Sequence, residues 1–85
     1  MYRIYLSKPA SRDVDQLSDQ DYRLVDQRIL SLQSDPRPRG CKKLKGQTED
    51  FYRIRQGRYR IIYSIDDELK SVTILEVTHR RDVYR

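Results

Sequence analysis

The fold of this chain is decided by the stretch FYRIRQGRYRIIY, residues Phe51–Tyr63. Apolar and basic residues alternate on both sides of Gly57-Arg58, which is the pattern of two β-strands joined by a two-residue turn. A glycine in the first turn position suits a type II′ turn, whose twist matches that of the flanking strands. The stretch therefore predicts a tight β-hairpin.

The register of this hairpin places arginines on one face of the sheet. Pairing outward from the turn predicts the cross-strand pairs Gln56 with Tyr59, Arg55 with Arg60, Ile54 with Ile61 and Arg53 with Ile62. Because side chains alternate between faces along a strand, Arg53, Arg55 and Arg60 emerge together; we call these three residues the arginine face. The residues expected on the other side are Tyr52, Ile54, Ile61 and Tyr63. Like charges opposite each other destabilise a sheet, so we expect an anionic ligand to bind the arginine face.

Positive charge is concentrated in the middle of the chain. The chain has 85 residues, enough for one small domain, and its net charge is +5. Residues 37–60 hold nine Lys or Arg against two acidic residues, a net +7, so the remaining residues sum to −2. This concentration is the footprint expected of a surface that binds phosphate groups.

The segments outside the hairpin predict the rest of an α+β fold. Residues Tyr2–Leu6 alternate and are rich in β-formers, which indicates a strand. Ser7 and Ser18 are capping residues, and we expect helices over Lys8–Leu17 and from Ser18 to about Ser34. The other expected segments are an extended linker at Pro36–Gly40, its continuation at Lys42–Gly46 with Leu44 turned inward, a polar turn at Asp66–Glu68, a strand at Ser71–Thr78 and a short basic tail at Thr78–Arg85.

These elements predict one domain over residues 1–85 with the order β-α-α-β-β-β. Both helices are expected to pack on the apolar face of a largely antiparallel sheet. That arrangement leaves the arginine face open to a ligand.

The sequence offers no constellation for a metal or a cofactor. Cys41 and His79 lie 38 positions apart without companions, which does not make an ordinary zinc site. The three glycines form neither a phosphate loop nor a dinucleotide turn. A single cysteine excludes an intrachain disulfide and favours a reducing compartment. No targeting segment or membrane-spanning apolar run is visible, so we expect a cytosolic protein.

The arginine face, together with His79 and Tyr84, suits recognition of an RNA backbone and cleavage of a phosphodiester bond. In metal-free cleavage the 2′-hydroxyl attacks the adjacent phosphorus, which requires a base, cations for the developing charge and an acid for the leaving 5′-oxygen. Arginine supplies the cations, because it stays charged and grips phosphate oxygens in a bidentate fork. With a pKa above about 12, arginine is a poor proton acceptor. The general base is therefore unassigned.

Each of these residues also has a plainer interpretation. The arginines could form a solvated outer face whose stems cover apolar surface. His79 suits proton transfer or is a structural or exposed histidine at a strand end. Tyr84 stacks on a base or orients a hydroxyl, or it pins the C-terminal tail to the sheet. The residues expected to attract RNA around this centre are Lys42, Lys43, Lys45, Arg58 and Arg81.

Four motifs extend from residue 43 into the tail: Lys43-Leu44-Lys45-Gly46, Tyr52-Arg53-Ile54-Arg55, Gly57–Tyr63 and His79–Tyr84. Together they resemble the RelE/ParE toxin superfamily, with which the N-terminal half agrees in length and in its two helices. RelE-like members are mRNA endonucleases that cut the codon in the ribosomal A site, and a cognate antitoxin wraps around them and holds them inactive. ParE-like members share the fold but poison DNA gyrase.

The resemblance implies roles for individual residues. Arg53 and Arg55 match a basic pair in the RelE active site, and Arg60 matches an arginine that stabilises the cleaved phosphate. Arg80 matches an arginine proposed to assist the leaving group. Tyr84 matches a near-terminal tyrosine that contacts the mRNA.

Two departures from the best-known RelE pattern concern proton transfer: lysines stand there in place of Arg53 and Arg55, and the shorter tail carries His79, which could share this work. The leading prediction is a metal-independent, ribosome-dependent endoribonuclease without a cofactor, the toxin of a type II toxin–antitoxin pair. The expected partners are an acidic antitoxin, in a hetero-oligomer, and mRNA on the ribosome with contacts to 16S rRNA. The alternatives are a gyrase-poisoning toxin and an RNA-binding module without catalysis.

Overall fold

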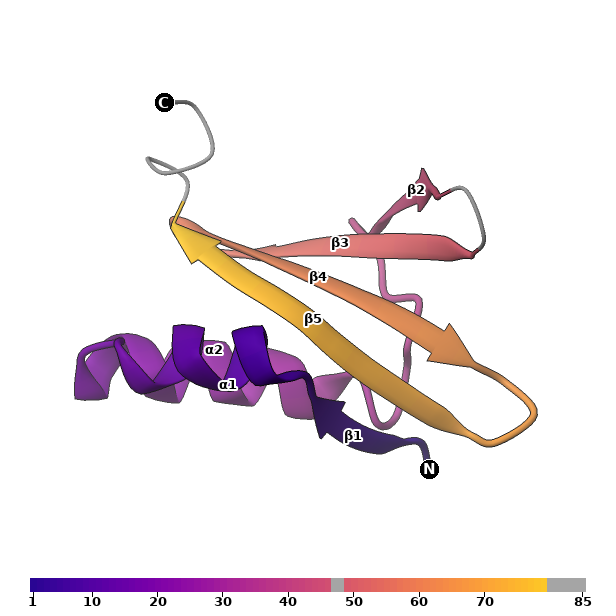
Figure 1. Ribbon diagram of the computed structural model, residues 1–85, viewed down its shortest axis with the longest axis horizontal. Coiled ribbons are helices and arrows are strands. Elements are labelled where there is room, and N and C mark those ends of the chain that lie inside the picture. Colours follow the sequence, from indigo (N-terminus) through magenta and orange to yellow (C-terminus); the bar gives the residue numbers. More distant parts are fainter. Residues whose placement is uncertain (47–48, 80–85) are drawn as a thin grey trace.

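The computed structural model describes residues 1–46 and 49–79, which form a five-stranded sheet with two helices on one side (Figure 1). The strand order is β1-β5-β4-β3-β2, in which β1 runs parallel to β5 and the other neighbours are antiparallel. The elements are β1 (Arg3–Leu6), α1 (Lys8–Asp15), α2 (Asp19–Ser31), β2 (Lys42–Lys45), β3 (Asp50–Gln56), β4 (Tyr59–Asp66) and β5 (Ser71–His79). The predicted α+β class and the helix-covered, largely antiparallel sheet are confirmed.

Serine side chains begin both helices, as the sequence predicts. The Ser7 hydroxyl accepts a hydrogen bond from the Ala10 amide at 3.1 Å, and the Ser18 hydroxyl accepts one from the Asp21 amide at 3.2 Å. Each bond satisfies an amide that has no partner within the helix. The helices end at Asp15 and Ser31, before the expected ends at Leu17 and about Ser34. The residues that follow make hydrogen bonds of the 3₁₀ type, between residues three positions apart, instead of continuing the α-helix. One example is the bond from Gln33 N–H to Leu30 O. Neither helix is long and apolar enough to cross a membrane.

The core lies between the helices and the inner face of the sheet, which is the face that the helices cover. Its largest fully buried side chains are Tyr63, Leu32, Ile54, Ile61, Ile74, Val25 and Val72. The buried hydroxyl of Tyr63 donates to the carbonyl oxygen of Pro36 at 2.7 Å, which ties the linker to the core. Burial raises the pKa of this hydroxyl. The inner face therefore holds the fold together.

Residues Lys42–Lys45 form a strand, so the expectation of a linker was wrong there. This strand, β2, pairs antiparallel with the edge of β3, and Leu44 lies opposite Phe51. Leu44 consequently lies on the outer face of the sheet, away from the helices, rather than turned inward as expected. Four residues with three lysines carry little β-strand signal of their own, and the unpaired edge of β3 provides the partner.

A polar cluster joins the linker, the N-terminus and the β4–β5 turn. The Arg37 guanidinium binds both carboxylate oxygens of Asp67, at 3.2 and 2.9 Å, and the Tyr2 hydroxyl donates to the same carboxylate at 2.7 Å. Arg37 also lies over the ring of Tyr52, 5.3 Å from its centroid. The two donors lower the pKa of Asp67 to about 2. We call Tyr2, Arg37 and Asp67 the polar latch.

The C-terminal half of β5 extends beyond β1 and is held by α1. Strand β1 ends where Leu6 pairs with Ile74. Beyond that point the Ser7 hydroxyl donates to Leu75 O at 2.9 Å, and the Asp13 carboxylate accepts from Val77 N–H at 2.9 Å. Side chains of the helix thus replace a neighbouring strand along this edge.

Candidate nucleic-acid interface

The hairpin has the register that the sequence predicts. Gln56 pairs with Tyr59, Arg55 with Arg60, Ile54 with Ile61 and Arg53 with Ile62. Gly57 has a φ of +58°, the left-handed region that the first position of a type II′ turn requires. Because this register sets the parity of both strands, Arg53, Arg55 and Arg60 lie together on the outer face, opposite the helices.

The three arginines differ in exposure. Arg55 is exposed, whereas Arg53 and Arg60 are half-buried against the sheet. The Nε atoms of Arg53 and Arg60, and the Oγ1 atom of Thr78 opposite Arg60, are buried and have no hydrogen-bond partner among the described residues. Buried polar atoms in native proteins nearly always have a partner. The outer face therefore presents polar groups whose hydrogen-bonding capacity a ligand or solvent would have to meet.

A carboxylate also belongs to this face. Oε1 of Glu76 accepts a hydrogen bond from Nη2 of Arg60 at 3.1 Å, and the two side chains are 40% and 33% exposed. A β-bulge in β5 brings Glu76 to the outer face: Ile62 pairs with Glu76 and Tyr63 pairs with Ile74, so Leu75 is the extra residue. Sequence reasoning missed Glu76, because strict alternation from the inward Val72 and Ile74 would turn it toward the helices.

Beside this ion pair the outer face has a shallow hollow of about 290 Å³. Its lining residues come from four strands and are Leu44, Phe51, Arg60, Ile62, Leu75 and Glu76. Apolar side chains thus lie next to a guanidinium and a carboxylate. An aromatic ring such as that of Phe51 can stack on a nucleobase, while the arginines bind the phosphates.

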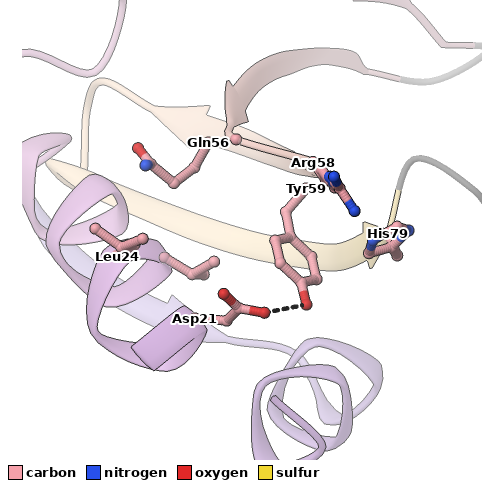
Figure 2. Close-up of a pocket in the computed structure, with 8 residues that line it drawn as sticks. Asp21, Leu24, Gln56, Arg58, Tyr59 and His79 are labelled. Carbon is pink, nitrogen blue, oxygen red and sulfur yellow. Dashed lines mark hydrogen bonds between the residues drawn. The ribbon is translucent and has the colours of Figure 1, made fainter. Parts of the chain in front are cut away.

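His79 lies on the opposite face of the sheet from the arginines. It pairs with Tyr59, and the two rings make an edge-to-face contact with centroids 5.3 Å apart. Figure 2 shows both side chains in a pocket between α2 and the hairpin turn, where the Tyr59 hydroxyl donates to Asp21 at 2.9 Å. His79 therefore does not share a face with the arginines: Thr78, its neighbour, is the residue opposite Arg60.

The basic residues expected around the centre are dispersed. Lys42 pairs with Arg53 and shares its face, whereas Lys43 forms an ion pair with Asp50 at 3.0 Å that raises the pKa of the lysine. Lys45 is exposed at the end of β2, and Arg58 lines the pocket in Figure 2. Arg80, Arg81 and Tyr84 lie outside the described residues.

Comparison with known proteins decides the family. A family model described as the ParE toxin of the type II toxin–antitoxin system parDE matches residues 4–84. The chain belongs to the ParE toxin family. This membership confirms the resemblance to the RelE/ParE toxins that the motifs around the hairpin indicate.

Individual relatives named RelE and RelG are also similar to this chain. Toxin RelG of Mycobacterium tuberculosis is 46% identical over 44 residues, which cover 52% of this chain and about half (51%) of RelG. Toxin RelE of the same organism is 28% identical over 85 residues, covering 99% of this chain and 87% of that protein. In the archaeal RelE–RelB complex from Pyrococcus horikoshii, one chain superposes with a TM-score of 0.81 at 32% identity, covering 93% of this chain and 94% of that one.

Proposed function

We propose that this protein is the toxin of a type II toxin–antitoxin pair and that it inhibits translation by cutting mRNA in the ribosomal A site. The observation that carries this proposal is the open outer face, where Arg53, Arg55 and Arg60 lie beside a hollow that could hold a nucleobase. Two relatives of this chain are named toxin RelE and toxin RelG. The RelE-like toxins, which the motifs of this chain resemble, cut mRNA, and this favours RNA as the target. The site of action would be the cytoplasm.

The arginine face provides the electrostatic part of the reaction. Arg60 would bind the scissile phosphate and stabilise the charge that develops on it, and Arg53 and Arg55 would bind the adjacent backbone. Arg80 would assist the leaving 5′-oxygen, and Tyr84 would contact the mRNA. Fixed guanidinium charges can perform the stabilising role in the absence of a metal ion, so the proposal assigns none.

A cognate antitoxin is the proposed partner. Residues 37–60 carry a net +7, which would attract an acidic segment that folds on binding and neutralises this charge. The Pyrococcus relative was solved as a RelE–RelB complex, which supports a hetero-oligomer of the same kind. Co-expression of a small acidic open reading frame next to the gene should abolish growth arrest.

The deciding experiment is primer extension on a translated message after a short pulse of expression. We expect new RNA ends within codons for the wild type and none for Arg60→Ala or Arg80→Ala, while circular dichroism shows that both variants remain folded. Arg12→Ala, an exposed position on α1, is the matched control and should stay active. Full toxicity of both Arg60→Ala and Arg80→Ala would show that the assigned face is not the active one.

A second candidate function is poisoning of DNA gyrase, because the matching family model is described as a ParE toxin. Expression would then produce cleaved plasmid and a DNA-damage response without cut transcripts. A module that only binds RNA would produce neither, and its binding would weaken steeply with salt. The same pulse of expression, followed by plasmid and RNA analysis, separates these outcomes.

A further inference from the structure

We propose that Glu76 is the general base of the cleavage reaction, which takes the proton from the attacking 2′-hydroxyl. This inference rests on the proposed ribonuclease function and fills the role that arginine cannot perform. The β-bulge in β5 places the Glu76 carboxylate beside Arg60 on the arginine face.

Among the described residues, Glu76 is the carboxylate that contacts the arginine face. Among the strand residues that the structure describes, the other acidic residue on the outer face is Asp66. Its carboxylate caps the β4–β5 turn by accepting a hydrogen bond from Leu69 N–H at 3.0 Å. Asp66 lies six residues from Arg60 along β4, roughly 20 Å at the rise of a strand. His79 faces the helices. A hydroxyl such as that of Thr78 is a weak base at neutral pH, so the carboxylate is the suitable proton acceptor.

Arg60 and Glu76 lie as close together as a phosphate-binding cation and a general base must lie for this reaction. The 2′-hydroxyl attacks the phosphorus that is attached to the 3′-oxygen of the same ribose, so the two reacting groups are only a few bonds apart. A base and a phosphate-binding cation must therefore lie within a few ångströms of each other, and Oε1 of Glu76 lies 3.1 Å from Nη2 of Arg60. The second oxygen, Oε2, makes no hydrogen bond to the described residues, and the side chain is 40% exposed. Oε2 is therefore available to the 2′-hydroxyl.

The surroundings hold this carboxylate in place. Arg60 fixes its orientation, while the bonds from Ser7 to Leu75 O and from Val77 N–H to Asp13 pin the backbone on both sides of Glu76. Phe51, Leu44 and Ile62 form the apolar wall of the adjoining hollow. A nucleobase bound there would exclude water from the ion pair and strengthen its electrostatic interactions.

In this step one bond between phosphorus and oxygen forms and another breaks. The Glu76 carboxylate accepts the proton of the 2′-hydroxyl as the 2′-oxygen forms a bond to phosphorus. The bond from phosphorus to the 5′-oxygen breaks, and the leaving oxygen takes a proton from water or from the acid that assists it. The products are a 2′,3′-cyclic phosphate and a 5′-hydroxyl, and Arg60 stabilises the negative charge on the phosphoryl oxygens during the step.

The test is single-turnover cleavage of mRNA on programmed ribosomes by Glu76→Gln, Glu76→Asp and the charge-matched control Glu68→Gln, which changes an exposed residue of the β4–β5 turn. We expect Glu76→Gln to lower the maximal cleavage rate roughly 10²- to 10⁴-fold, the usual contribution of a general base. Glu76→Asp should retain part of the rate and Glu68→Gln all of it. Binding to ribosomes that carry a 2′-deoxy mRNA, which cannot be cleaved, should be unchanged in Glu76→Gln.

Three outcomes overturn the proposal. If Glu76→Gln cleaves at the wild-type rate, or faster, Glu76 is not the base, while cleavage by the wild type still upholds the ribonuclease function. If rate and 2′-deoxy mRNA binding fall by the same factor, Glu76 only positions Arg60. If the wild type cuts no RNA, the proposed function and this inference fail together.

Discussion

The two faces of the β3–β4 hairpin are built from alternate residues of the same two strands, yet they differ in almost every physical property. On the inner face Ile54, Ile61 and Tyr63 are fully buried beneath the helices. On the outer face Arg53, Arg55 and Arg60 gather positive charge, and the Nε atoms of two of them have no partner among the described residues. The inner face gains stability by burial, whereas the outer face accepts repulsion between Arg55 and Arg60.

Stability and the proposed activity are therefore assigned to opposite faces of one hairpin. Neighbouring residues such as Arg60 and Ile61 are only one position apart, but they should affect different measurements. Substitutions on the inner face should change the free energy of unfolding, and those on the outer face should change RNA cleavage.

The largest effect is expected for Ile61→Ala. Ile61 has no exposed surface, and its truncation should lower the free energy of unfolding by about 2–5 kcal/mol, measured by urea denaturation. Arg60→Ala is the control on the adjacent residue and should cost much less stability. Equal losses for the two variants would contradict the separation of the faces.

A smaller effect on the inner face is expected for Tyr63→Phe. The change removes the hydroxyl that donates to Pro36 O at 2.7 Å and leaves this buried carbonyl without its donor. The expected loss is about 1–3 kcal/mol in the same urea titration. Tyr22→Phe, at a ring that is 45% exposed, should be nearly neutral. A neutral Tyr63→Phe would mean that the linker is not held by this bond.

The polar latch should make the stability of the fold depend on pH, independently of substitutions on either face of the sheet. The pKa of Asp67 is depressed from 3.8 to about 2 in the folded state, so its contribution is present above about pH 4 and is lost as the pH falls through about 2. Asp67→Asn should therefore be less stable than the wild type at pH 7. The difference in stability between the wild type and Asp67→Asn, measured by thermal unfolding, should shrink as the pH falls from about 4 to about 2.

Glu68→Gln, in the same turn, serves as the control for the latch because Glu68 is exposed. Its stability should track that of the wild type at every pH. A difference between wild type and Asp67→Asn that stays constant down to pH 2 would show that the ion pair with Arg37 does not carry this contribution.

The smallest effect is expected on the outer face itself. Arg55→Gln removes the repulsion with Arg60 directly opposite and should raise the free energy of unfolding by about 0.2–1 kcal/mol at low salt. The gain should vanish in about 1 M salt, where charges are screened within roughly 3 Å. RNA binding should weaken at the same time. Arg23→Gln on α2 is the control, and an equal gain there would indicate a general charge effect.

Local sequence was sufficient where the signal lies within one short segment. The hairpin register followed from alternation on both sides of Gly57, and the serine caps of both helices followed from residue type. Strand β2 could not be predicted in this way, because four residues with three lysines become a strand only when the edge of β3 pairs with them. Both helices end before the predicted residue, since propensity does not fix the last hydrogen bonds.

That three arginines share one face follows from the local chain alone, because the alternation of side chains along a hairpin is a property of consecutive residues. Which other residues join the three arginines depends on how β5 pairs with β4. The bulge at Leu75, set by hydrogen bonding between β4 and β5, reverses the parity of β5. It thereby brings Glu76 to Arg60 and turns His79 toward Tyr59 and the helices. No pattern within β5 specifies this reversal, because it arises from the pairing of two strands and not from either strand alone.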